Sequence, residues 1–253
     1  NIEDLVRIAG DAGLVLVEVV KDHENLLCFA RPRHYATYCD INYWPRAKVM
    51  IETLAEHAWP CVVHVLAYDM ETENAAKAMA TSADVRVAIG PELEDYWPDR
   101  TPVEKMWSYG PAFVGNLMDR TGEPITYVDA DIMFFSSPEP LFAEWGGVGC
   151  AAVPHAFPAN PPRGIREATH LQFGEFNVGI VHFGSVEPAR KWASMCDAWC
   201  YDRLEDGKYG DQKYLESVAR IATEYPGACV GPWGIHGKAL EERESRVYFG
   251  GKP

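Results

Sequence analysis

Strands and helices alternate along this sequence from residue 34 onwards, and this alternation limits the possible folds more than any other feature. Short apolar, β-prone runs are separated by stretches with helical periodicity. The predicted elements are a strand at 34–40, a helix at 47–57, a strand at 61–69, a helix at 73–81 and a strand at 85–89. This order predicts a mostly parallel sheet with helices on both faces, and such a sheet binds ligands at the carboxyl ends of its strands.

The second half of the chain continues the pattern with less regular spacing. A buried strand is predicted at 125–128, and an aromatic strand pair is predicted around 176–183. Helices are predicted at 103–120, at 188–204 and at 212–221. The first of these is expected to be interrupted at Gly110-Pro111, because proline removes a backbone donor and clashes with the preceding turn.

The size of the chain suits one main domain with a small appendage. A length of 253 residues with 47% apolar composition is enough to bury the core of one α/β domain. We expect this domain to span 32–253, with 1–31 as an N-terminal extension of one helix and two strands. The wording AGLVLVEVV and NLLCFARP within the extension weakly resembles the end of a class I methyltransferase domain. The alternative is an extension that adds strands to the edge of the main sheet.

The charge and the cysteines restrict the partners and the compartment. A formal net charge of -14 opposes nonspecific binding to a polyanion, so nucleic acid is not expected as a partner. The seven cysteines are odd in number and lie mostly in apolar runs, a pattern typical of reduced, buried thiols in a cytoplasmic protein. Cys196 and Cys200 lie one helical turn apart, but no second pair at ligand spacing accompanies them, which favours core packing. No apolar stretch reaches the roughly 20 residues of a membrane span, although peripheral membrane contact stays open.

Asp129 and Asp131 carry the clearest chemical signal. In an extended strand end, residues two apart point the same way, so both carboxylates are expected on one side of the sheet edge. Two adjacent carboxylates repel each other unless a cation lies between them, and Mg²⁺ or Mn²⁺ suits such oxygen ligands together with phosphate oxygens. The motif alone is not specific, because 15 aspartates in 253 residues produce about one D-x-D by chance. The alternative interpretation is an acidic turn between a strand and a loop.

Four ordered stretches resemble bacterial glycosyltransferases of the GT-A fold, in the retaining, glycogenin-like group. They are YATYCDINYWPRAKVMIETLAEH, TPVEKMWSYGPAFVGNLMD with YVDADIMFFSSPEPLF, FGEFNVGIVHFGS, and WCYDRLEDGKYGDQKYLE. The resemblance covers most of 34–233 and is more specific than one D-x-D. It implies transfer of a sugar from a nucleoside diphosphate sugar to a hydroxyl acceptor, which is a glycan, a lipid-linked molecule or a small molecule, with Mn²⁺ or Mg²⁺ as cofactor.

The resemblance also implies roles for particular residues. The nucleoside would be held by Tyr38, Cys39, Asp40, Asn42 and Tyr43, with Asp69 close by and Lys105 near the ribose or phosphates. Asp129 and Asp131 would be the metal and ribose ligands. Asn177 would face the donor sugar or the acceptor, and Asp211 and Gln212 would bind sugar while also capping the helix that follows them. The alternatives are a solvated helix face for Lys105 and a turn-stabilising amide for Asn177.

The end of the sequence departs from the family pattern. Members of this group complete the metal site with a histidine after a late strand, whereas this chain ends with VYFGGKP, read as a strand with no partner strand. We therefore expect the domain to lack its last strand, with His236 either the third metal ligand or a surface-loop histidine.

Two rival functions remain at this stage. A nucleotidyltransferase would carry a glycine-rich phosphate loop after the first strand, where this chain has I-N-Y-W-P-R. A noncatalytic sugar-nucleotide or glycan binding module on the same fold is the other alternative, and intact Asp129 and Asp131 argue against it.

Overall fold

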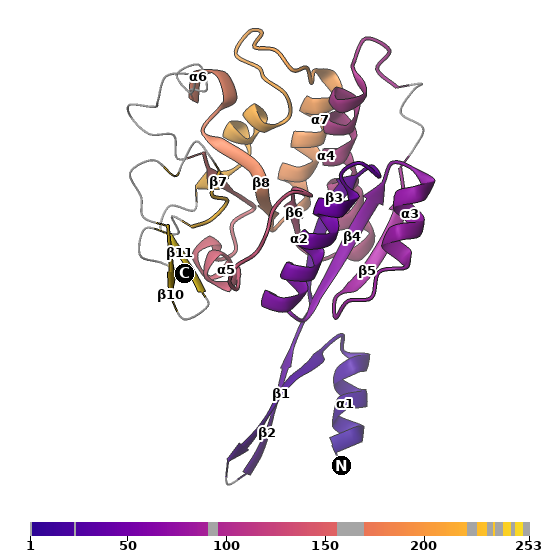
Figure 1. The fold of residues 1–253 in the computed structure, drawn as a ribbon, viewed down its shortest axis with the longest axis vertical. Helices are drawn as coiled ribbons and strands as arrows, with labels where there is room; N and C mark the ends of the chain where they lie inside the picture. Colours follow the sequence, from indigo (N-terminus) through magenta and orange to yellow (C-terminus); the bar gives the residue numbers. More distant parts are fainter. Residues whose placement is uncertain are drawn as a thin grey trace.

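The computed structural model describes residues 2–22, 24–90, 96–155, 170–221, 227–231, 235, 240–243 and 246–249. Within these residues, one seven-stranded sheet has the order β5-β4-β3-β6-β8-β7-β9, and two smaller two-stranded sheets lie apart from it (Figure 1). The strands of the large sheet are β3 (Arg33–Cys39), β4 (Cys61–Ala67), β5 (Asp84–Ile89), β6 (Ile125–Val128), β7 (Cys150–Pro154), β8 (Phe176–Phe183) and β9 (Arg220–Ile221). The predicted α/β fold with a mostly parallel sheet is confirmed.

The strand order creates a switch point in the middle of the sheet. Strand β3 pairs in parallel with β4 on one side and with β6 on the other, while β8 runs antiparallel to both β6 and β7. The strands that follow β3 in the chain, β4 and β5, lie on one side of it. The later strands of the large sheet, from β6 onwards, lie on its other side. In open α/β sheets, ligands bind where the order reverses, beyond the carboxyl ends of the two central strands. Here those ends are Cys39 and Val128.

Helices cover both faces of the sheet, and the alternation of side chains along each strand divides the core in two. Tyr35 of β3 packs with helix α2 (Trp44–His57) and helix α5 (Glu139–Trp145) on one face. Its neighbour Ala36 packs with helices α4 (Pro102–Thr121) and α7 (Val186–Ala198) on the other face. Figure 1 shows α4 and α7 side by side. Successive side chains along a strand point to opposite faces of the sheet, so each strand contributes residues to both cores.

Helix α4 is continuous through Gly110-Pro111, which corrects the predicted interruption. A capping box joins Thr101 and Glu104 at its start, and Gly122 ends it with left-handed backbone angles, φ 69° and ψ 7°. Proline costs the helix one internal hydrogen bond. The buried face of α4, which packs against the sheet and α7, offsets this cost.

Two further helix predictions need correction. Helix α7 ends at Ala198 rather than Leu204, because Trp199 already has extended angles. The Arg100 guanidinium ties this end to the start of α4 by donating to the carbonyl oxygens of Cys196 and Asp197 at 2.9 and 2.7 Å. The predicted helix at 212–221 is a 3₁₀ helix, η2 (Gln212–Ser217), followed by edge strand β9.

The remaining elements flank this framework. Helix α3 (Met70–Lys77) and the short helix α6 (His170–Phe173) complete the helices. The helix and two strands expected at the N-terminus are α1 (Ile2–Asp11), β1 (Val15–Asp22) and β2 (Glu24–Ala30). The pair β1–β2 forms its own sheet and projects from the body of the molecule in Figure 1, so the alternative that it extends the main sheet is wrong.

The late strand also has a partner that the sequence did not reveal. Strand β11 (Arg246–Phe249) pairs antiparallel with β10 (Leu240–Arg243) in a short hairpin. The expectation of an unpaired strand at this position is therefore wrong. The charged side chains of β10 hid its strand character, since the sequence LEER has no apolar alternation.

No helix among the described residues is long and apolar enough to cross a membrane. All six cysteines whose side chains are described are free of disulfides, and five of them are buried, as predicted. Cys28 lies outside the side chains that the structure describes.

Candidate active site

Asp129 and Asp131 lie in a turn rather than at an extended strand end. Strand β6 ends at Val128, and the N–H of Ile132 donates to the carbonyl oxygen of Asp129 at 3.2 Å. The N–H of Asp129 in turn donates to the carbonyl oxygen of Gly179 in β8 at 3.0 Å. The expected strand geometry is thus wrong, but both carboxylates still line the same cavity. The turn therefore places both carboxylates on the same side of the sheet edge, as the strand periodicity was expected to do.

The cavity, here called the polar pocket, lies at the switch point of the sheet and has a volume of about 180 Å³. It is built from three elements that the fold brings together. Its walls are Tyr38, Cys39, Asp40 and Tyr43 at the end of β3 and in the loop after it, Met106 and Trp107 of α4, and Tyr127, Ala130 and the two aspartates at the end of β6 and in the turn after it. Four residues predicted to hold a nucleoside therefore line one cavity with the predicted metal ligands.

Aromatic side chains hold the polar pocket in shape. The Tyr127 hydroxyl donates to Oδ1 of Asp129 at 2.7 Å, and the rings of Tyr38 and Tyr127 lie 5.4 Å apart between centroids. Gly110 of α4 makes room for this arrangement, because a Cβ there would lie 2.2 Å from Cε1 of Tyr38. The glycine inside a long helix thus has a packing reason, since it lets the tyrosine ring fit beneath the helix.

Negative charge is concentrated at the base of the site. Burial raises the pKa of Asp129 to about 6, against the opposing effect of the Tyr127 hydrogen bond, and the charge of Asp131 raises it further. Burial also raises the pKa of Asp211 to about 7, with the charge of Asp129 as the next cause, while backbone N–H groups lower it. Two carboxyls that share a weakly hydrated space resist ionising together. A cation placed between them would relieve this repulsion.

Asp211 reaches this group because of its backbone conformation. It precedes η2 with helical angles, φ -90° and ψ -31°, and its side chain makes no capping hydrogen bond, so the predicted capping role is wrong. A capping residue needs an extended conformation to turn its side chain over the helix start. The indole N–H of Trp192 in α7 donates to the carbonyl oxygen of Asp211 at 2.9 Å and holds the residue in place. Gln212 follows as the half-buried first residue of η2.

Asn177 has the turn-stabilising contact that was its alternative role. Its Oδ1 accepts the N–H of Gly179 at 2.6 Å and the thiol of Cys229 at 3.3 Å. A Cβ at Gly179 would lie 2.2 Å from the Cys229 sulfur, so only glycine fits there. Burial raises the pKa of Cys229, and the charges of Asp129 and Asp131 raise it further, so the thiol stays protonated beside the carboxylates. No sequence signal pointed to Cys229, since it lies far from the D-x-D in the chain.

The loop after β3 is fixed by two acidic side chains. Asp40 accepts the N–H of Tyr43 at 3.0 Å and the Nδ2 of Asn42 at 3.1 Å. Asp69 accepts the N–H of Ile41 at 2.8 Å while it caps α3. Burial acts to raise the pKa of Asp69, but its hydrogen bonds with Thr72 and Ile41 outweigh this and leave the pKa below its ordinary value. Asp69 therefore acts as an ionised clamp on the loop rather than as part of the pocket wall.

Three of the residues predicted to bind the nucleotide do not line the polar pocket, and neither do Asn177, Asp211 and Gln212. One further predicted residue lies outside the described part of the chain. Asn42 and Asp69 support its loop from outside, and Lys105 lies half-buried on α4, next to the wall residues Met106 and Trp107. His236 falls outside the described residues. The structure thus brings together six of the predicted binding and metal residues in one cavity. Asp211 lies within electrostatic reach of Asp129, and Asn177 is hydrogen-bonded to Cys229, whose pKa is raised by the charges of Asp129 and Asp131.

The residues present fit a divalent metal held in part by substrate. Among the described residues, no group of three or more His, Cys, Asp or Glu side chains is arranged to hold a metal ion. Mg²⁺ and Mn²⁺ sites at phosphates typically use one or two carboxylates and complete the shell with phosphate oxygens and water. Asp129 and Asp131, with their unfavourable mutual charge, match this kind of donor set.

Known proteins are similar to this chain in sequence and in structure, and the structural similarity agrees with the α/β architecture. No family model matches the chain. The uncharacterized protein YfnD of Bacillus subtilis strain 168 is 25% identical over 237 residues, covering 87% of this chain and 75% of YfnD. The galactosyltransferase LgtC, solved with donor and acceptor sugar analogs, superposes with a TM-score of 0.52 at 18% identity, covering 75% of this chain and 73% of LgtC.

The glycosyltransferase GlyE of Streptococcus pneumoniae TIGR4 is also similar, with a TM-score of 0.48 and 16% identity over 76% of this chain. This chain spans 45% of the length of GlyE, which is less than half of that protein. The likeness to LgtC shows that the chain has a GT-A-like glycosyltransferase fold, in agreement with the predicted fold.

Proposed function

We propose that the chain is a metal-dependent glycosyltransferase that moves a sugar from a nucleoside diphosphate sugar to a hydroxyl acceptor, with retention at the anomeric carbon. The observation that carries this proposal is the position of Asp129 and Asp131 in the polar pocket at the switch point of the sheet. Burial, and after it the charge of Asp131, raises the pKa of Asp129 to about 6, and a cation beside the two carboxylates would stabilise their ionised forms. The likeness of the fold to LgtC supports the same function.

Asp129 and Asp131 would hold Mn²⁺ or Mg²⁺ together with the diphosphate of the donor. When bound, the ion offsets the charge that develops on the departing nucleoside diphosphate. Tyr127 donates a hydrogen bond of 2.7 Å to Oδ1 of Asp129, which fixes the orientation of the carboxylate and leaves Oδ2 to bind the ion. Asp69 positions the loop of the nucleoside side through its bond to Ile41.

The polar pocket has an aromatic part that suits a nucleoside, and two polar side chains outside its lining suit a sugar. Tyr43 and Trp107 provide apolar faces that suit a flat base. One of the two polar side chains is Asp211, which has a pKa of about 7, so near neutral pH it both accepts and donates hydrogen bonds to hydroxyls. Asn177 uses its Oδ1 within the fold, which leaves its Nδ2 group as the donor to a sugar. No side chain is assigned as the acceptor's base, and the departing phosphate oxygen takes the acceptor's proton in this scheme.

Thermal-shift screening tests the proposal most directly. UDP-, GDP- and dTDP-sugars, each with and without Mn²⁺, should separate the true donor from the rest, because a ligand that binds only the folded state raises the melting temperature with its concentration. Asp131→Ala should abolish the part of the shift that depends on Mn²⁺. A mutant that binds donor and metal like the parent would overturn the assignment of the site.

A parallel assay separates the enzyme from a binding module. Release of nucleoside diphosphate should require Mn²⁺ or Mg²⁺ and the donor identified in the screen. Metal-dependent binding of that donor without any release, over a range of hydroxyl acceptors, would favour a noncatalytic module on the same fold.

A further inference from the structure

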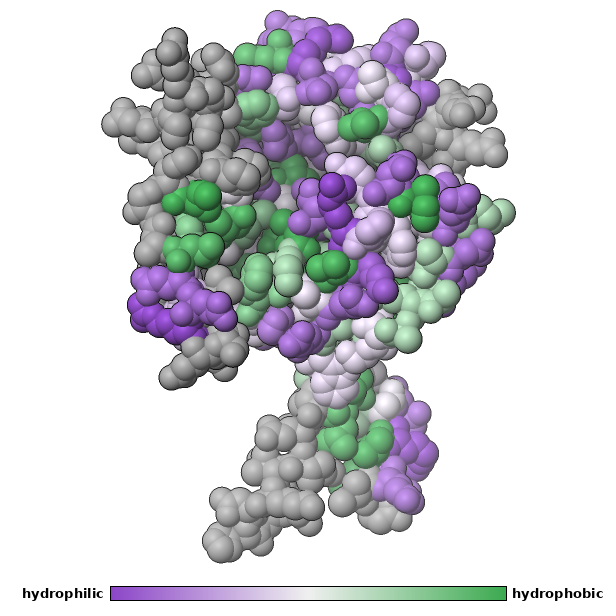
Figure 2. All heavy atoms as spheres, viewed as in Figure 1, coloured by the Kyte–Doolittle hydropathy of each residue, from purple (hydrophilic) through white to green (hydrophobic). Residues whose placement is uncertain are grey.

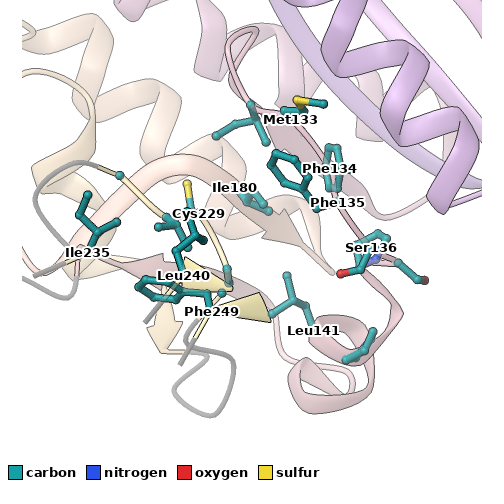
Figure 3. A pocket seen from close by; sticks show the side chains of 18 of the residues that line it. Met133, Phe134, Phe135, Ser136, Leu141, Ile180, Cys229, Ile235, Leu240 and Phe249 are labelled. Carbon is teal, nitrogen blue, oxygen red and sulfur yellow. The ribbon is translucent and has the colours of Figure 1, made fainter. Parts of the chain in front are cut away.

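A second, larger cavity opens beside the polar pocket and is almost entirely apolar. It has a volume of about 600 Å³, within the range of small-molecule sites. Its described lining comes from 131–138 after β6, Pro140 and Leu141 of α5, Ile180 of β8, the segment 227–231, Ile235, and the β10–β11 hairpin (Figure 3). We call it the apolar groove.

The floor of the apolar groove is part of the folded core. Phe134, Leu141 and Ile180 are each buried and belong to the core cluster that includes α2. The N–H of Phe134 donates to Oγ1 of Thr53 in α2 at 3.1 Å, which fixes the floor to that helix. The floor is therefore held in place by the main sheet and its covering helix.

The rim of the apolar groove exposes large hydrophobic side chains to solvent. Phe135 is 52% exposed and Leu240 is 67% exposed, and Met133 is exposed beside them. Figure 3 shows Phe135 on one side of the cavity and Leu240 with Phe249 on the other. Figure 2 shows hydrophobic surface next to the charged residues of β10 on the same face. Clustered exposed apolar side chains at a cavity typically mark a binding site.

Few groups in the apolar groove suit a bare sugar. Among the described lining residues, the strongly polar side chains are those of Asp131, Ser136 and Ser137. A sugar carries a hydroxyl on most of its carbons, and each hydroxyl that loses water without a partner costs binding free energy. The groove instead favours a ligand whose body is hydrocarbon.

Asp131 connects the two cavities, because it lines both of them. A ligand in the apolar groove would therefore end next to the diphosphate side of the polar pocket, where an acceptor hydroxyl is required. The net charge of -14 and the carboxylate of Asp131 in the lining disfavour an anionic ligand in the groove. The occupant suited to the groove is thus uncharged.

We propose that the apolar groove binds the hydrocarbon part of an uncharged acceptor, whose reactive hydroxyl faces Asp131. This inference rests on the proposed glycosyltransferase function and specifies its acceptor class. The shared Asp131 determines the orientation of the ligand, with its polar end towards the metal site and its apolar end towards Leu240 and Phe249.

Calorimetric titration with butyl, hexyl and octyl β-D-glucopyranosides, each below its micelle concentration, tests the groove independently of catalysis. The affinity should rise by up to about fourfold for each added methylene, the factor that corresponds to burying one CH₂ group. Free glucose should show no measurable binding. Equal affinity for all three glycosides would overturn the inference.

Rim variants test the place of binding. Phe135→Ser and Leu240→Ser change exposed side chains and should reduce the affinity for octyl glucoside at least fivefold. Leu204→Ser is the matched control, because Leu204 is 47% exposed and lies outside the groove lining. Unchanged affinity in both rim variants would overturn the assignment. So would light scattering that shows a dimer dissociated by Leu240→Ser, since a second copy would then cover the groove.

The groove and the proposed function fail in distinguishable ways. Asp129→Asn should remove metal-dependent donor binding but leave octyl glucoside binding unchanged, because Asp129 lines only the polar pocket. If the parent protein binds no donor but its affinity for the glucosides still rises with chain length, the glycosyltransferase function is rejected. Intact donor binding and release with no chain-length dependence would reject only the hydrocarbon-bearing acceptor.

Discussion

The polar pocket and the apolar groove meet at Asp131, yet they are built in different ways. The polar pocket follows the ends of β3 and β6 and is closed by α4, so the hydrogen bonds of the sheet determine its geometry. The apolar groove has a core floor, but its opposite wall comes from 227–231 and the β10–β11 hairpin, which pairs with no strand of the large sheet.

This difference suggests a division of tasks between the two cavities. Chemistry that needs fixed distances suits positions held by packed strands, whereas recognition of varied ligands suits loops and short hairpins at the surface. The polar pocket would then be the constant part of the site, and the apolar groove the part that determines the acceptor. The predictions below test whether the two cavities respond separately.

The largest expected effect comes from Asp129→Asn. Removing one of two carboxylates that face the donor phosphates should lower metal-dependent release of nucleoside diphosphate on the order of a hundredfold, the scale seen when one charge-stabilising group is lost. Asp119→Asn is the control, because Asp119 forms a surface ion pair with Arg190 at 2.6 Å. Initial rates at saturating Mn²⁺ provide the measurement, and equal rates for the two variants would contradict a metal role for Asp129.

A smaller effect is expected when the packing behind the polar pocket is disturbed. The Cβ in Gly110→Ala would meet the Tyr38 ring at 2.2 Å, and relieving this overlap should lower the free energy of unfolding by about 2–3 kcal/mol. Donor affinity should fall as Tyr38 is displaced, while octyl glucoside affinity should stay close to that of the parent.

Gly115→Ala is the matched control in the same helix. Its Cβ would lie 3.9 Å from the nearest atom of Arg190, an ordinary contact, so the variant should gain roughly 0.5–1 kcal/mol from helix propensity. Denaturant unfolding measures both variants. If Gly110→Ala were as stable as Gly115→Ala, the close fit between α4 and Tyr38 would be wrong.

The smallest effect concerns the fold beneath both cavities. Burial lowers the pKa of His64 in β4 to about 4, and the neighbouring His34, Arg86 and Arg120 lower it further, against Asp84. The unfolded chain, with a histidine pKa near 6.5, therefore binds more protons than the folded chain between about pH 6.5 and 4, so stability is lost as the pH falls through this range. His64 should account for about 1–2 kcal/mol of the loss between pH 7 and 5.

His64→Gln should make the dependence of unfolding free energy on pH less steep, as measured by urea titrations at pH 7, 6 and 5. His57→Gln at the end of α2 serves as the control. Because His64 lines neither cavity, donor and glycoside affinities at pH 7 should not change in either variant. A slope equal to that of the parent would show that the pKa of His64 is the same in the folded and unfolded chain, which would contradict the lowering by burial.

Much of the central architecture was predictable from local sequence patterns. The strands at 34–40 and 61–69 and the helix at 47–57 follow from apolar periodicity, and they differ from β3, β4 and α2 only near their ends. The position of Asp129 and Asp131 on one side of the sheet edge was predicted as well, although they lie in a turn and not in an extended strand end. The continuous α4 was not predictable, because the cost of Pro111 is local while the packing that offsets it comes from the sheet and α7.

The candidate site shows the same limit. Asp211 was identified from the resemblance to glycosyltransferases, but its helical backbone angles, and the hydrogen bond from Trp192 to its carbonyl oxygen that holds it near Asp129, come from the tertiary structure. Cys229 was missed altogether, since a thiol near carboxylates leaves no signal in a sequence where the partners lie about a hundred residues apart.

The sequence by itself determined the alternation of strands and helices, the excess of negative charge and the chemical nature of the Asp129 and Asp131 turn. These properties depend on residues near one another in the chain. Only the tertiary structure decided that Asp131 is shared by a polar pocket and an apolar groove, and that Asp211 and Cys229 lie near the same carboxylates. Such neighbourhoods form when distant strands pair and their faces are buried, and no local pattern of residues specifies which distant side chains will meet.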